Sequence, residues 1–275
     1  MHRIFAIGIS LLLSFTLFSQ ENENYLQIVE AERELKRMFE ELYEVEVTGT
    51  NMDRFHAIDS LFYEALQLPG SFDHRWGSLD MIGKLVSDDG LVKVFSWVYM
   101  ASRDQYHYTA FIQVQDRRGE SELFRLNPGD AENMMSEDYP QSIDDWHGKV
   151  YYSILTNEYK RKTFYTLLGA DFKDTKTSAK TIEVLTIQRG KPVFRDDQFL
   201  DGGTVRDRVV LEYSAELTIS VQFNKRLGMI VFDHVVPLHP LYHGHYQFYG
   251  PDGSYNGYRF TEGIWVLEED VDARN

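Results

Sequence analysis

The chain has 275 residues, no cysteine and a formal net charge of −15 at neutral pH. This acidity argues against nucleic acid as a partner, because such a chain repels phosphate backbones. The lack of cysteine excludes disulfides, a cysteine nucleophile and a lipidated cysteine, but 43% hydrophobic residues are ample for a core held by packing and hydrogen bonds.

The first twenty residues predict export. His2 and Arg3 form a short basic start, and the uncharged apolar run 4–18 has the length of a signal-peptide h-region. A transmembrane helix needs roughly 20 apolar residues, so a retained anchor is the weaker alternative. We expect cleavage after Ser19 or Gln20, which leaves a soluble periplasmic or secreted protein with no membrane partner.

Behind this signal peptide of residues 1–20, two helices are expected in a segment of residues 21–79 that packs on a β domain of residues 80–275. Apolar side chains recur at three- and four-residue spacing between positions 25 and 43, the mark of an amphipathic helix. On the polar side of this helix, Glu32 is expected to pair with Lys36 four residues later.

The second helix has clearer end signals. Thr50 and Asp53 form a capping box ahead of an amphipathic run that begins at Phe55, and the Leu-Pro-Gly sequence at 68–70 ends it.

From residue 80 the apolar pattern changes from a period of 3.6 to a period of 2. The alternating segments are short, and their connections are too short for the helical crossovers of parallel strands, so the pattern predicts an antiparallel meander. The fold class is mainly β with two N-terminal α-helices, and barrel-like, sandwich and propeller-like arrangements all remain open. The predicted strands are 81–86, 91–99, 106–115, 121–126, 149–155, 162–169, 181–188, 208–213, 217–223 and 229–233.

Turns and one long loop separate these strands. The loop covers residues 127–146, which are rich in Asp, Glu, Asn and Pro, and it is either functional or a plain surface insertion. The predicted turns are 89–90, 116–119, 157–158, 188–190, 201–204, 224–228 and 251–253.

The densest polar cluster lies late in the chain, where residues 233–245 contain one aspartate and four histidines. Asp233, His234, His243 and His245 are candidate ligands of a divalent metal, because imidazole and carboxylate suit zinc and related ions. Such a metal lowers the pKa of bound water and supports a metal-dependent hydrolase. The alternative is that Pro and Gly in this segment turn the side chains apart, and then no cofactor is expected.

Aromatic residues suggest a second kind of site. Trp97 and Trp265 are candidate ligand-binding residues, since exposed indole rings stack on sugars and other ligands with an apolar face. The alternative is that these rings fill the core.

Sequence motifs for catalysis are otherwise missing. The chain has no nucleophile elbow and no phosphate or dinucleotide fingerprint. Residues 252–257 match the opening of a calcium loop, but its twelfth position is Gly263 instead of a glutamate.

Five short segments resemble a family of exported bacterial proteins without an assigned function. They are FYEALQLPGSF at 62–72, FYTLL at 164–168, LEYSA at 211–215, IVFDH at 230–234 and FYGPDGSY at 248–255. The resemblance implies an exported, single-unit protein and transfers no catalytic residue.

The leading hypothesis is a non-catalytic binding or structural module with a carbohydrate or protein partner. The alternatives are the metal-dependent hydrolase and a carbohydrate-binding protein.

Overall fold

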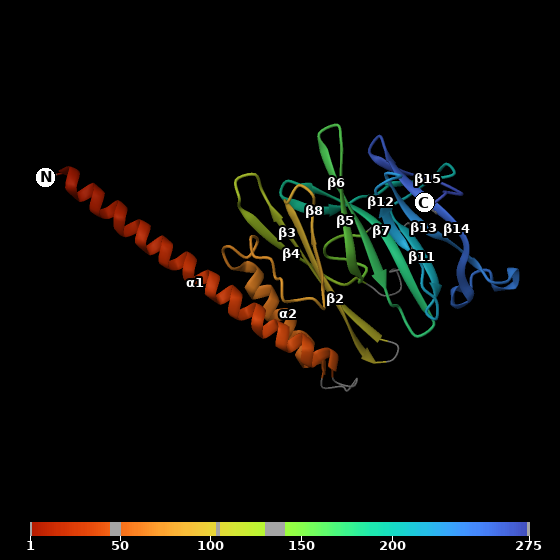
Figure 1. Cartoon of the computed structure of the whole chain (residues 1–275), viewed down its shortest axis with the longest axis horizontal. Coiled ribbons are helices and arrows are strands. Elements are labelled where there is room, and N and C mark those ends of the chain that lie inside the picture. The colour runs from red at the N-terminus through yellow and green to blue at the C-terminus, as the bar shows by residue number, and fades with distance from the viewer. Residues whose placement is uncertain (1, 45–50, 103–104, 130–140, 274–275) are drawn as a thin grey trace. The chain divides into compact units, whose positions relative to one another are not determined.

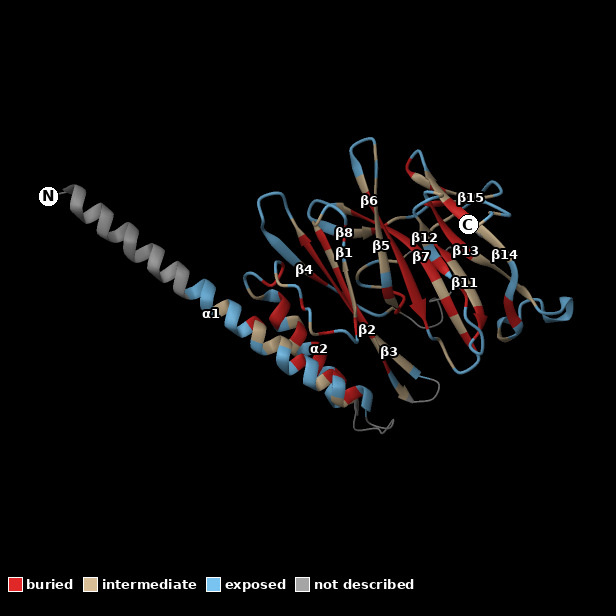
Figure 2. Cartoon of the chain, in the orientation of Figure 1, coloured by how far each residue is buried: buried red, intermediate tan, exposed pale blue. Residues whose placement is uncertain are grey.

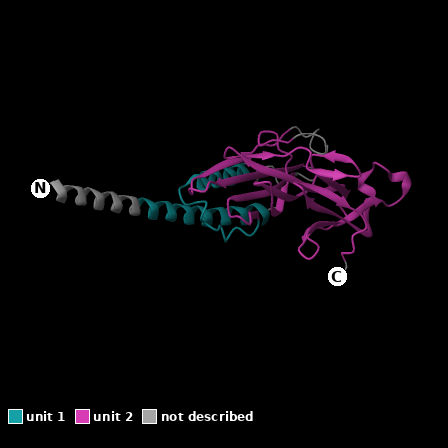
Figure 3. Cartoon of the chain, turned by 90° about the horizontal axis from the view of Figure 1, so that it is seen from above, with its two compact units in different colours: residues 1–81 teal, residues 82–275 magenta. Residues whose placement is uncertain are grey.

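A computed structural model describes residues 2–44, 51–102, 105–129 and 141–273 of the chain (Figure 1). The chain divides into two compact units, residues 1–81 and residues 82–275 (Figure 3). It is mainly β with two N-terminal helices, as the sequence patterns predict.

The first unit contains α1 (His2–Glu44) and α2 (Asn51–Gln67). The two helices pack through apolar stripes at the spacing that the sequence predicts, and positive φ at Gly70 follows the end of α2. Thr50 of the predicted capping box lies outside the described residues. Within the described residues, no helix has both the length and the apolar character to cross a membrane. The buried side chains of the two helices include Ile28, Leu35, Phe39, Leu42, Phe55, Ile58 and Phe62.

The expected Glu32–Lys36 pair is wrong. The Glu32 carboxylate instead accepts hydrogen bonds from the backbone N–H of Ser78 at 2.7 Å and from its hydroxyl at 2.8 Å, and it contacts His74. Lys36 pairs with Glu40. A polar partner from the segment after α2 thus replaces the local partner, because Glu32 lies on the part of the helix that this segment covers.

Three open sheets form the second unit. The first sheet has the order β1 (Gly83–Val86), β2 (Val92–Ser102), β3 (Gln105–Gln115), β4 (Ser121–Leu126). The middle sheet has the order β11 (Val209–Ser214), β7 (Thr177–Gln188), β6 (Lys162–Asp171), β5 (Val150–Tyr159), with β8 (Lys191–Phe194) beside β7. The third has the order β10 (Thr204–Arg206), β9 (Phe199–Asp201), β15 (Ile264–Glu268), β14 (Tyr249–Thr261), β13 (Met229–Pro237), β12 (Val221–Asn224).

Two central strands of the middle sheet, β6 and β7, are buried on both faces over most of their length, and β7 is largely red in Figure 2. Leu167 and Leu185 belong to a core shared with the first sheet. Their immediate neighbours in the two strands, Leu168 and Val184, belong to a core shared with the third sheet. Because successive side chains of a strand alternate between faces, one strand supplies both cores and reads as a continuous apolar run.

Each of the ten predicted strands overlaps an observed one, although residues 217–220 lie outside β12, and five further strands were not predicted. These are β8, β9, β10, β14 and β15. Most of them are short or rich in glycine, and they depend on pairing with distant strands more than on their own propensity. Residues 246–248, just before β14, form a 3₁₀ turn.

Two predicted turns are also wrong. Residues 157–158 lie inside β5, and the β5–β6 hairpin turns at Lys160 and Arg161, whose φ values are +47° and +65°. Residues 251–253 lie inside β14. The 201–204 turn is confirmed, with positive φ at Gly202 and Gly203 as a two-residue hairpin requires. Of the predicted loop, residues 130–140 lie outside the described residues, and its ends meet where Pro128 pairs with Trp146.

Candidate functional site

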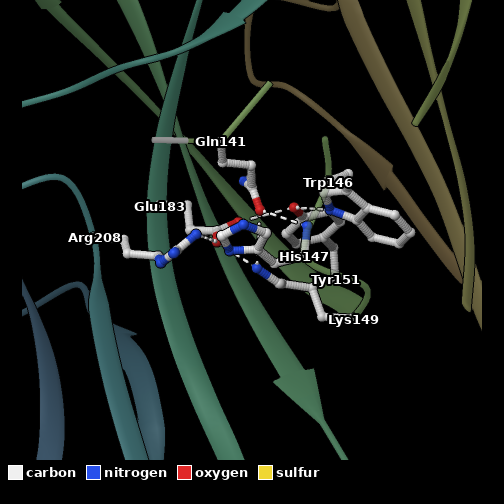
Figure 4. Close-up of polar contacts among 7 residues, drawn as sticks. All are labelled: Gln141, Trp146, His147, Lys149, Tyr151, Glu183 and Arg208. Atoms are coloured by element: carbon white, nitrogen blue, oxygen red, sulfur yellow. Dashed lines mark hydrogen bonds and ion pairs between the residues drawn. The ribbon is translucent and has the colours of Figure 1, made fainter. Parts of the chain in front are cut away.

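A cluster of charged side chains lies inside the second unit (Figure 4). Lys149, Glu183 and Arg208 are only 2%, 2% and 3% exposed. The Lys149 ammonium contacts Glu183 Oε1, and Arg208 Nη1 lies 4.0 Å from the same oxygen. The other carboxylate oxygen accepts a hydrogen bond from the Tyr151 hydroxyl at 2.9 Å. One carboxylate thus holds two buried cations, and the hydroxyl adds a third contact.

Neighbouring groups complete this cluster. Trp146 Nε1 donates to the Tyr151 hydroxyl at 2.9 Å, and the Gln141 side-chain oxygen accepts from the His147 backbone N–H at 3.0 Å. Gly169 leaves room for the aliphatic part of Lys149, since a Cβ there would lie 2.9 Å from Lys149 Cδ. The cluster therefore depends on three strands and on the segment just before β5.

Burial and charge shift the pKa values of these groups. Burial lowers the pKa of Lys149, although Glu183 opposes this shift. Burial alone raises the pKa of Glu183, but the attraction of Lys149 and Arg208 outweighs it and holds this pKa below its ordinary value. Burial, followed by repulsion from Arg208 and Lys149, lowers the pKa of His147 to about 4. At neutral pH Glu183 is therefore ionised and His147 is neutral.

Perturbed pKa values often mark catalytic sites, but this cluster has no room for a substrate. The cavity beside Glu183 and Arg208 has a volume of about 10 Å³, which is space for a single water molecule at most. We therefore interpret the cluster as a structural brace between the strands of the middle sheet.

A much larger cavity than the one beside Glu183 and Arg208 is a groove beside β5 and β12. Its volume of about 510 Å³ falls in the range of ligand sites. Its lining is mixed, with apolar, amide, hydroxyl and charged groups. The lining residues are Asp88, residues 152–157, Leu168, Gln222, Phe223 and Lys225.

One edge of β12 pairs with β13, and the other edge borders the groove and directs backbone N–H and C=O groups toward it. The Asp233 N–H donates to the Ser220 carbonyl at 3.1 Å, so these two residues form a hydrogen-bonded pair of the antiparallel ladder. Hydrogen-bonded and open pairs alternate, so Val221 and Phe223 direct their N–H and C=O groups away from β13. The Tyr152 hydroxyl donates to the Val221 carbonyl at 3.0 Å. No described residue binds the outward groups of Phe223.

Asn157 adds a second unused group to the groove. Its side-chain oxygen Oδ1 is buried and has no hydrogen-bond partner among the described residues. A buried acceptor without a partner costs about 1–3 kcal/mol relative to one that is hydrogen-bonded. A ligand that donates a hydrogen bond here would remove this cost.

The predicted metal ligands lie apart in the structure. His234 Nδ1 contacts Asp252 Oδ2 at 3.0 Å, and the Asp233 carboxylate accepts from the Ser220 N–H at 2.6 Å. His243 and His245 lie in the exposed turns between β13 and β14. Among the described residues, no three His, Cys, Asp or Glu side chains gather in a way that holds a metal ion.

Within the partial calcium-loop match, Asp252 serves local structure. It accepts hydrogen bonds from the backbone N–H and the hydroxyl of Ser254, and these bonds together with His234 lower the pKa of Asp252 to about 2. The contacts of this carboxylate are thus with Ser254 of β14 and His234 of β13, both in its own sheet.

The two candidate ligand-binding tryptophans lie in the core. Trp97 is 1% exposed and packs against Phe111, whereas Trp265 is 0% exposed and donates Nε1–H to the Thr166 hydroxyl at 2.9 Å. Neither ring offers an exposed face for a sugar. This placement corresponds to core packing, the alternative interpretation of these residues.

Sequence reasoning missed the groove, because no motif marks it. Phe223 belongs to a predicted strand, but its free edge depends on which strands pair with β12, and Asn157 falls on a wrongly predicted turn. One signal was available for the buried cluster: Glu183 interrupts the apolar sequence between Ile182 and Val184. No family model, no curated protein and no solved structure matches the chain.

Proposed function

We propose that the chain is an exported binding protein and that its ligand site is the groove beside β5 and β12. The export part of this proposal rests on the basic start and apolar run of residues 1–20. The binding part rests on one observation: the groove presents the outward backbone groups of Phe223, which have no partner among the described residues.

The ligand that fits these groups is an extended peptide segment. A strand laid along β12 would accept a hydrogen bond from the Phe223 N–H and donate one to its carbonyl, as in other cases of β-strand addition. If the Asn157 side chain turns toward the groove, its Oδ1 can accept a hydrogen bond from a further backbone or side-chain donor of the peptide. Asp88 and Lys225 supply one charge of each sign, so the groove does not require a strongly charged peptide.

The test begins with selection of random octapeptides displayed on phage against the purified full-length chain. The affinity of a selected peptide is then measured by fluorescence anisotropy for Phe223→Pro and Phe223→Ala. Proline removes the outward N–H and leaves the ladder with β13 intact, so an edge strand tolerates it. Alanine is the matched control, because it loses the ring but keeps the N–H.

We expect Phe223→Pro to weaken binding at least fivefold beyond Phe223→Ala, the equivalent of about 1 kcal/mol for one hydrogen bond. Asn157→Leu should also weaken binding while leaving the free protein at least as stable as before. Equal affinities of the proline and alanine variants would contradict strand addition. Failure to select any peptide, together with binding on a glycan array, would favour the carbohydrate alternative.

A further inference from the structure

A second surface, remote in sequence from the groove residues of β5, exposes large apolar side chains. It lies in the turns between β13 and β14, in the blue part of the chain in Figure 1 and largely pale blue in Figure 2. Leu241 is 82% exposed and Leu238 is 65% exposed. We call these turns, together with the neighbouring Leu217, the 238–248 surface. Its exposed large apolar side chains are Leu217, Leu238, Leu241, Tyr242, Tyr246 and Phe248.

A hollow lies within the same surface. It has a volume of about 360 Å³, and Leu217, Leu238 and Phe248 supply its apolar lining. Leu241 belongs to the same surface but does not line the hollow. The surface therefore combines a projecting apolar side chain with a recess large enough for one. Exposed apolar patches of this kind mark contact sites, because water solvates them poorly.

The charges of this surface favour a second copy of the chain as its occupant. Residues 238–248 contain no aspartate or glutamate, although the chain carries 43 of them. Two copies of a chain with a net charge of −15 repel each other least where carboxylates are absent. The surface can thus meet itself at a lower electrostatic cost than the acidic remainder of the chain.

The hollow also carries one charge of each sign. Lys176 and Glu216 both line it, and neither side chain forms an ion pair within the described residues. In a contact with two-fold symmetry, a residue that meets a different residue of the other copy does so twice, because the reverse contact occurs as well. A cation and an anion in one patch can therefore form two equivalent ion pairs across the axis.

We propose that the 238–248 surface binds the same surface of a second copy around a two-fold axis. Leu241 of each copy enters the hollow of the other, and Lys176 of each copy faces Glu216 of the other. This contact is independent of the groove, so either proposal stands if the other fails.

Sedimentation of the full-length chain in an analytical ultracentrifuge over a micromolar concentration range tests the proposal. We expect a concentration-dependent dimer and at least a hundredfold weaker association for Leu241→Glu. Leu26→Glu is the matched control, because Leu26 is an exposed leucine of α1 and should leave the association unchanged. Circular dichroism checks that each variant keeps its strand content.

Charge reversal makes the test specific to this geometry. Lys176→Glu and Glu216→Lys should each weaken the dimer by about tenfold, and the double variant should restore it, because the two-fold axis places these residues opposite each other. A monomer at every concentration, or a double variant weaker than both single ones, overturns the proposal. Co-sedimentation of a monomer with phosphatidylcholine vesicles that Leu241→Glu abolishes would instead assign the surface to a lipid bilayer.

Discussion

Removal of the Glu183 charge should destabilise the fold far more than removal of the Lys149 charge. The Glu183 carboxylate contacts both buried cations, so Glu183→Gln removes the ion pair of Lys149 and the 4.0 Å pair of Arg208 at the same time. The new amide N–H group also points a donor at a cation or at the Tyr151 hydroxyl. In Lys149→Met the carboxylate keeps Arg208 at 4.0 Å and the hydrogen bond from Tyr151.

The size of the effect follows from this burial. Breaking a buried ion pair from one side costs about 3–5 kcal/mol, a large share of the roughly 5–15 kcal/mol that stabilises a folded protein. For Lys149→Met we expect less than about half of that cost, because the remaining ion pair is balanced. With a urea slope of about 2 kcal/mol per molar, Glu183→Gln should lower the unfolding midpoint by about 2 M.

Urea unfolding at pH 7.5, followed by circular dichroism and tryptophan fluorescence, measures both costs. Glu122→Gln is the matched control, because Glu122 is exposed on β4 and its substitution should change the free energy of unfolding by less than about 0.5 kcal/mol. A Glu183→Gln cost below about 1 kcal/mol, or a larger cost for Lys149→Met, would refute the role of Glu183 as the shared counter-charge.

Three further predictions concern other buried or strained groups. Because the pKa of His147 lies at about 4, below its ordinary 6.5, the unfolded chain takes up a proton first as the pH falls. The free energy of unfolding should therefore fall by about 3 kcal/mol on account of this residue as the pH drops from 6.5 to 4, with no loss above pH 6.5. His147→Gln should remove this pH dependence from the free energy of unfolding measured in urea. Thr166→Val should lower the melting temperature by at least about 2 °C in calorimetry, since it leaves the Trp265 N–H buried without its acceptor, and no change would contradict this. Gly263→Ala should cost more than Gly253→Ala in the same assay, because both have positive φ but only the Cβ at 263 meets an aromatic ring, at 2.7 Å, and equal costs would disprove the clash.

Strands in which polar and apolar side chains alternate regularly could be predicted from the sequence. Residues 121–126 form β4 as predicted, residue for residue, because side chains that alternate in polarity suit a strand with one buried face. β14 shows the limit of this reading. It contains three glycines and a proline, and yet it pairs with β13 and β15 on its two sides. Its extended form depends on these neighbours, which local propensity does not report.

The candidate site was less accessible to sequence reasoning. The histidines of residues 233–245 are close in sequence, but His234 lies on β13 beside Asp252, whereas His243 and His245 lie in exposed turns. Closeness in sequence thus did not gather three of the described side chains around a metal ion. Lys149 and Glu183 are 34 residues apart and still form an ion pair. The register of β5, β6 and β7 places them together.

Periodicity and composition thus determined by themselves that this is a mainly β chain with two N-terminal helices, since both depend on neighbouring residues and on the alternation of polar and apolar side chains. They also predict export. Only the tertiary structure decided that Trp97 and Trp265 are core residues, that Glu183 is buried between cations, and that no described residue pairs with the outward backbone groups of Phe223. Each of these properties depends on which strands pair and which faces stack, and these contacts join residues far apart in the sequence.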